Sequence, residues 1–143
     1  MSEISTFTSR PARITCTARE FFGFVTDARN FEQFISAETF SNLKADKDSL
    51  SFQASMLGHV SLRIAENTEY SKVIYRGENQ QVKDFMLKAD IADSGSGSCE
   101  VTLTLQAELN PILRMFAEAP AKKLLDALTV QMEKYRGWNK PRS

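Results

Sequence analysis

The chain of 143 residues contains few of the residue types that mark metal, redox or membrane proteins. It has one histidine, two cysteines and four prolines. Cys16 and Cys99 have neither CxxC spacing nor histidine companions, which argues against a metal site and favours free thiols. The sequence has no run of about 18 uncharged apolar residues, so we expect no membrane-spanning helix. We also identify no cofactor.

The chain also has no excess of positive or negative charge. Lysine and arginine together number 18, as do aspartate and glutamate, and the formal net charge is zero. The chain therefore lacks the positive field typical of nucleic-acid-binding proteins, and we expect no nucleic-acid partner. Residues 1–5 show no basic segment followed by an apolar run, so we expect a cytoplasmic protein. A chain of this length fits one domain spanning residues 1–143 that buries roughly 70% of its unfolded surface.

Alternation of apolar and polar residues predicts most of the strands. Leu50, Phe52, Ala54 and Met56 alternate with polar residues, which is typical of a strand with one dry face. A turn at Gly58-His59 should lead into a similar strand. The remaining strands are expected at residues 4–16, 40–45, 60–64, 73–75, 85–91 and 101–107. The first should be bent at Arg10-Pro11, because proline cannot donate a ladder hydrogen bond.

Helix signals appear at three places. Thr17-Ala18-Arg19-Glu20 fits a capping box, and Asp27 can cap a second short helix that carries Phe31, Phe34 and Ile35. Asn110-Pro111 should start a long final helix that ends near Gly137. Its apolar stripe comprises Leu113, Phe116, Ala117, Ala121, Leu124, Leu128, Met132 and Tyr135. Pro120 should kink this helix without dividing it, because the stripe keeps its phase.

These elements predict an α+β protein with a curved, seven-stranded antiparallel sheet. Two short helices lie between the first and second strands, and only the final helix is long enough to cover the dry face. In this topology the first and last strands are neighbours, which could bring Cys16 near Cys99. We expect no disulfide between them, because a reducing compartment opposes it.

The order of elements resembles the helix-grip fold of the SRPBCC superfamily, which includes START-like domains, pollen-allergen-like proteins and polyketide cyclases. Three local segments are similar to small uncharacterised bacterial members. They are Ala18-Arg19-Glu20-Phe21-Phe22, Thr26-Asp27-Ala28-Arg29-Asn30-Phe31-Glu32 and Ala107-Glu108-Leu109-Asn110-Pro111. The resemblance implies a fold more than an activity, since the superfamily supports many functions on one scaffold.

The resemblance and the helix-over-sheet arrangement favour binding of a small apolar or amphipathic ligand, lipid-like or polycyclic, between the sheet and the final helix. An enzyme resembling polyketide cyclases or dehydratases is one alternative. A protein-interaction module, as in co-chaperone or ribosome-associated relatives, is another, and homodimer formation stays open. The residues expected to line the cavity are Phe52, Leu62, Ile64, Glu66, Tyr75, Arg76, Phe85, Leu87, Leu103, Leu105, Phe116, Leu124 and Leu128. Their bulk leaves two interpretations open, a filled core or a usable cavity.

No catalytic constellation is evident among the polar residues. His59 is interpreted as an exposed turn residue, because no carboxylate or nucleophile lies beside it in sequence. Alternation would place Glu66 and Asp93 on the dry face, where desolvation would raise their pKa values, unless the strands have already left the sheet. Arg76 facing inward could hold a carboxylate or phosphate group, and Tyr75 facing inward could offer one hydroxyl.

Overall fold

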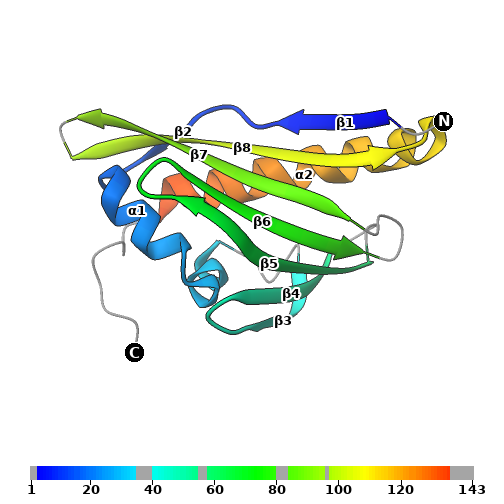
Figure 1. Cartoon of the computed structure of the whole chain (residues 1–143), viewed down its shortest axis with the longest axis horizontal. Helices are drawn as coiled ribbons and strands as arrows, with labels where there is room; N and C mark the ends of the chain where they lie inside the picture. Colours follow the sequence, from blue (N-terminus) through cyan, green and yellow to red (C-terminus); the bar gives the residue numbers. More distant parts are fainter. Residues whose placement is uncertain (1–2, 35–39, 55–57, 80–83, 96, 136–143) are drawn as a thin grey trace.

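The computed structural model describes residues 3–34, 40–54, 58–79, 84–95 and 97–135. In these ranges one antiparallel sheet has the strand order β1-β8-β7-β6-β5-β4-β3, and β2 also pairs with β8. Helix α2 (Pro111–Lys134) runs along one face of the sheet, and α1 (Ala18–Val25) lies near its carboxyl end (Figure 1). The strands are β1 (Glu3–Thr8), β2 (Ala12–Ile14), β3 (Phe40–Ala45), β4 (Ser49–Ala54), β5 (Gly58–Thr68), β6 (Lys72–Asn79), β7 (Phe85–Gly95) and β8 (Ser98–Leu109). The predicted helix-grip α+β fold is confirmed.

The first predicted strand is divided into β1 and β2, which accounts for eight strands instead of seven. Both pieces pair with β8, and the break contains Arg10 and Pro11, as predicted. Ser9 keeps the ladder satisfied at the break: its amide donates to the Leu103 carbonyl at 2.8 Å, and its hydroxyl accepts from the Leu103 amide at 2.9 Å. A side chain therefore replaces the backbone acceptor where the strand bends.

The capping box at the start of α1 is confirmed. The Glu20 amide donates to Thr17 Oγ1 at 3.1 Å, and the Thr17 amide donates to Glu20 Oε1 at 2.9 Å. After α1 the chain forms a short 3-10 helix, η1 (Ala28–Gln33), where the second helix was predicted. Phe34 is fully buried directly after η1. Ile35, the other end of that predicted apolar face, lies outside the described residues.

Strands β3 to β8 follow one another as antiparallel neighbours. The predicted turn at Gly58-His59 is wrong, because both residues belong to β5 and pair with the end of β4. His59 is exposed, as expected, and its ring bonds with the Gln53 and Ser61 side chains. Asn79 is the last residue of β6. A period-two pattern marks strand interiors well, but strand ends depend on pairing with neighbours.

Helix α2 is continuous through Pro120, as predicted, and it packs against β8, β1 and β2. The predicted stripe holds from Ala121 to Met132, where its members are buried, and Leu113 and Ala117 are half-buried. Phe116 does not belong to it: its side chain is 70% exposed. Phe116 directly precedes Ala117, so it points about 100° away around the helix axis and misses the sheet.

The carboxyl end of α2 is attached to the sheet by Glu133, an interaction that no sequence pattern indicated. Arg10 donates to both Glu133 oxygens at 2.8 and 2.6 Å, and the Arg13 amide donates to Glu133 Oε2 at 3.1 Å. The hydrogen bonds from Arg10 and Arg13 lower the pKa of Glu133 to about 2. The break at Pro11 therefore also presents the groups that hold the end of the helix.

Candidate ligand-binding site

The space between the sheet and α2 is largely filled by side chains. Tyr75, Phe21, Phe34, Phe52 and Leu87 are among the largest fully buried residues. What remains is an apolar pocket of about 50 Å³ near the amino-terminal half of α2. It is lined by Phe7, Val60, Asn79, Phe85, Leu105, Ala107, Leu109, Ala117, Ala121 and Leu124. Of the two interpretations that the sequence left open, the structure favours a mostly filled core with a small remaining pocket.

Small residues create the pocket. Ala107 on β8 and Ala117 and Ala121 on α2 line it from facing sides, so the helix and the sheet approach there without large side chains between them. Phe85 covers another part of the wall, and its ring lies over Gly77 on the neighbouring strand. A methyl group at Gly77 would overlap that ring. Gly77 therefore determines where Phe85 sits and, through it, the shape of the pocket.

The structure brings three of the thirteen predicted site residues to this pocket, namely Phe85, Leu105 and Leu124. Five others are packed in the core without lining it: Phe52, Tyr75, Leu87, Leu103 and Leu128. Leu62 is buried and Ile64 half-buried, whereas Glu66, Arg76 and Phe116 are exposed. Sequence alternation found the dry face but could not indicate which of its residues border empty space. The sequence did not identify Phe7, Ala107 and Ala117 as pocket residues, because no local pattern shows that a small residue, or one far away in the chain, borders a cavity.

Of the two positions that the sequence left open for Glu66, on the dry face or in solvent, the structure shows the second: Glu66 is exposed. The pairing of β5 with β6 shifts between Ile64 and Glu66, so one extra residue interrupts the alternation there. Asp93 is also exposed, near a second shift between Asp93 and Gly95, and it accepts a hydrogen bond from the Gly95 amide at 3.0 Å. Both carboxylates belong to the outer ends of long strands.

Tyr75 does face inward, but its hydroxyl is already used within the fold. It is 1% exposed and donates to the Val25 carbonyl at the end of α1, at 2.7 Å. Burial raises the pKa of Tyr75 well above its usual value, so the hydroxyl stays protonated and can keep donating. Tyr75 thus joins β6 to α1 and does not reach the apolar pocket.

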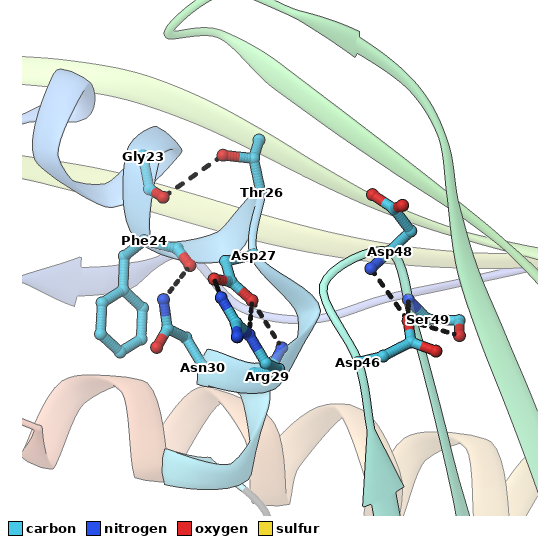
Figure 2. A network of polar contacts seen from close by, with 9 residues as sticks. All are labelled: Gly23, Phe24, Thr26, Asp27, Arg29, Asn30, Asp46, Asp48 and Ser49. Carbon is cyan, nitrogen blue, oxygen red and sulfur yellow. Dashed lines mark hydrogen bonds and ion pairs between the residues drawn. The ribbon is translucent and has the colours of Figure 1, made fainter. Parts of the chain in front are cut away.

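The segment after α1 carries Asp27, which was expected to cap a short helix, and Asn30. Asp27 accepts from the Arg29 amide at 3.1 Å and forms an ion pair with its guanidinium at 2.6 Å, while Asn30 donates to the Phe24 carbonyl at 2.8 Å (Figure 2). The Ala28 amide also donates to the Lys47 carbonyl in the β3–β4 turn at 2.8 Å. These bonds position η1 against the hairpin, in keeping with a structural role.

Cys16 and Cys99 are both buried free cysteines, as expected. Ile14 at the end of β2 pairs with Cys99, which brings Cys16 close to Cys99, as the topology predicted. The hydrogen bond with Cys99, together with burial, raises the pKa of Cys16. The described residues hold no group of three or more potential metal ligands from His, Cys, Asp and Glu. None of the described helices is both long and apolar enough to cross a membrane.

The chain has a helix-grip fold, so the resemblance seen in the sequence is confirmed at the level of the fold. Solved structures with this fold include norcoclaurine synthase from Thalictrum flavum in complex with dopamine and hydroxybenzaldehyde. It has a TM-score of 0.70 and 11% identity over 94% of this chain and 90% of that one. A START superfamily protein from Mycobacterium smegmatis has a TM-score of 0.61 and 13% identity, with 92% and 97% coverage.

A protein from Rhizobium loti is also similar, with a TM-score of 0.61, 16% identity and coverage of 92% of this chain and 99% of that one. No protein-family model matches the sequence, and no curated protein matches it. At these identities the structural neighbours establish a shared architecture across nearly the whole chain. The function must be argued from the residues of this chain.

Proposed function

We propose that this protein binds a small apolar or amphipathic molecule in the pocket between the sheet and the amino-terminal half of α2. The observation that supports this proposal is the composition of the pocket wall, in which Asn79 is the one polar residue among ten. The Asn79 side chain donates to the His59 carbonyl at 2.7 Å, so its polar end is held by the fold and the surface that faces the pocket is apolar. Such a wall suits an apolar group of a ligand.

The size of the pocket constrains the ligand. Pockets for drug-sized molecules have volumes of about 300–1,000 Å³, whereas this pocket holds about 50 Å³. A narrow group, such as an alkyl segment or a single ring, is therefore the expected occupant unless the wall moves. The wall most able to move is the start of α2, because Pro120 cannot donate to the Phe116 carbonyl and the turns before it are largely exposed.

Titration with indole and with decanoate, followed by NMR of the methyl groups, tests the proposal. We expect saturable shifts of Leu105 and Leu124, and no comparable shifts of Leu50 at the opposite edge of the sheet. Ala117→Leu places three additional carbons in the pocket wall and should weaken binding by about tenfold. Ala119→Leu adds the same group at an exposed position on the same helix and should bind within about twofold of the native chain.

Binding that is absent in the native protein, or equally strong in both leucine variants, would contradict the proposal. Native mass spectrometry of protein purified from its own host provides a second test. A co-purifying molecule that is lost in Ala117→Leu and retained in Ala119→Leu would support the pocket as its site. The enzyme alternative required Glu66, Asp93, Arg76 or Tyr75 beside the cavity, and the structure brings none of these four side chains to the apolar pocket.

A further inference from the structure

The face of the sheet opposite α2 carries a second cavity, of a different chemical character. It is an open cleft of about 520 Å³ over β3, β4, β5 and β6. Its polar lining comprises three cations, three carboxylates and three serines: Lys44, Arg63, Arg76, Asp46, Glu78, Asp84, Ser49, Ser51 and Ser61. The core side chains of the same strands point to the other face, so this cleft is separate from the apolar pocket.

Two arginines lie directly opposite each other in the cleft. Arg63 on β5 pairs with Arg76 on β6, and both side chains are exposed. Directly paired residues in an antiparallel sheet have Cβ atoms about 5 Å apart, and like charges in that position repel. Within the described part of the chain, neither guanidinium forms an ion pair or a side-chain hydrogen bond. The pair thus has a net positive charge without a bound counter-charge from the fold.

A third cation is directed to the same face by an irregularity in β3. The pairing of β3 with β4 shifts between Ser41 and Lys44, so Lys44 pairs with Ser51 and shares its face. Asn42, within the shift, has a φ of 55°, a left-handed conformation that asparagine tolerates well. Without this extra residue, Leu43 would lie opposite Ser51. The bulge therefore exchanges an apolar side chain for an ammonium group at the edge of the cleft.

Serines form the floor between these cations. Ser51 pairs with Ser61, and Ser49 pairs with Arg63. Their short side chains leave room above the sheet. The Ser51 hydroxyl can donate a hydrogen bond to a ligand, whereas the Ser49 hydroxyl already donates to Asp46 and Ser61 Oγ bonds with His59 Nε2. The nearby carboxylate of Asp46 is directed into its own turn, where Oδ1 accepts from the Asp48 amide and from the amide and hydroxyl of Ser49, at 3.0 to 3.1 Å (Figure 2). It does not form an ion pair with either arginine.

The geometry points to a binding site for the phosphate group of a small soluble phosphate ester between Arg63 and Arg76. Two planar guanidinium groups offer paired donors from two directions, and a tetrahedral phosphate dianion has enough oxygens to accept from both, unlike a single carboxylate. Lys44 can add a further charge. Glu78 pairs with Ser61 on the floor, and Asp84 also lines the cleft. These carboxylates would repel an extended polyanion or an anionic membrane, which favours a small molecule held by the two arginines over either.

Titration with phenyl phosphate and inorganic phosphate at constant ionic strength, followed by amide NMR, tests this site. We expect saturable shifts on β4, β5 and β6, and none with the same concentration of benzyl alcohol. Arg63→Gln and Arg76→Gln should each weaken phenyl phosphate binding by at least about tenfold. Arg63→Lys keeps the charge but loses the planar fork, so its affinity should fall between those of the native chain and Arg63→Gln.

Arg13→Gln is the matched control, because Arg13 is an exposed arginine on β2, outside the cleft. It should bind phenyl phosphate within about twofold of the native chain. Without phosphate, Arg63→Gln should be at least as resistant to urea as the native chain, since it removes a like-charge repulsion. Non-saturating shifts, equal weakening by Arg13→Gln, or binding to phosphatidic acid vesicles without binding to phenyl phosphate would overturn the proposal.

Discussion

At the scale of single residues, the clearest assignment concerns Tyr75. Its hydroxyl, buried and donating to the Val25 carbonyl, is the link between the middle of the sheet and the end of α1. An inward tyrosine in a helix-grip fold could equally have served a ligand. In this chain the backbone accepts its hydrogen bond, so removing the hydroxyl should affect stability and leave the apolar pocket intact.

We therefore expect Tyr75→Phe to lower the free energy of unfolding by about 1–3 kcal/mol, because the Val25 carbonyl loses a buried donor. Urea unfolding measures this change. Tyr70→Phe is the control: Tyr70 is 39% exposed, and phenylalanine retains its ring contact with Phe22. Its effect should stay within about 0.5 kcal/mol. Equal effects of the two substitutions would show that the Tyr75 hydrogen bond contributes no measurable stability.

Other single residues show why side-chain position could be only partly predicted. Local alternation correctly indicated an inward Leu62. His59 is exposed, as predicted, although it lies in strand β5 and not in the predicted turn. The sequence left Glu66 undecided and misplaced Phe116. A bulge altered the first position, and a rotation of about 100° per residue around α2 removed the second from the sheet. In both places a shift of one residue along the chain changes the side of the strand or helix on which a side chain lies. Strand pairing and helix packing set that shift.

At the scale of elements, one carboxylate adds a polar attachment to the apolar packing of α2 on the sheet. Glu133 joins the last turns of the helix to the break between β1 and β2 through Arg10 and the Arg13 amide. The sequence shows the break, through Pro11, but not its partner, which lies more than 100 residues away. Such a long-range ion pair has no local sequence signature.

This attachment should make the free energy of unfolding depend on pH in the acid range. The pKa of Glu133 is about 2 in the folded chain, against an ordinary value of 4.5. Its stabilising contribution is therefore fully present above pH 4.5 and is lost as the pH falls toward 2. We expect Glu133→Gln to be less stable than the native chain at neutral pH and to approach it through this window. Urea unfolding at successive pH values measures the difference.

Glu118→Gln provides the comparison for that series, since Glu118 forms an exposed i,i+4 pair with Lys122 on the same helix. Its effect should be about 0.5 kcal/mol or less at any pH. If the loss of stability in Glu133→Gln stays constant down to pH 2, the proposed link between Glu133 protonation and stability is contradicted. In that case the carboxylate would contribute through packing or through neutral hydrogen bonds, both of which glutamine can preserve.

At the scale of the whole molecule, the reactivity of the two buried thiols can show whether the fold unfolds as one cooperative unit. Cys16 and Cys99 are each about 1% exposed and lie between β2, β8 and the start of α1. An alkylating reagent can reach them only after these elements separate. The raised pKa of Cys16 further limits its reactivity at neutral pH.

We expect labelling with iodoacetamide, followed by intact mass, to yield chains with either no label or two labels. The first label does not fit in the packed interior, so it should hold the chain open for the second. The labelling rate should rise with urea in parallel with unfolding. Accumulation of singly labelled chains in native buffer would instead show that one end of the sheet opens independently of the rest.

The sequence by itself determined the elements and their order. Alternation marked the strands, the capping box at Thr17 and the Asn110-Pro111 pair started the helices, and the balance of charges disfavoured a nucleic-acid surface. These features are encoded within a few residues of one another, so they can be read locally.

Only the tertiary structure decided how much space remains inside the sheet and which polar groups meet on its surface. The apolar pocket depends on Ala107 meeting Ala117 and Ala121 across two elements, and on Gly77 admitting the ring of Phe85. The phosphate site that we propose depends on the register that sets Arg63 against Arg76. Cavities and cross-strand pairs are relations between distant segments, and they follow from packing and register, which no local pattern specifies.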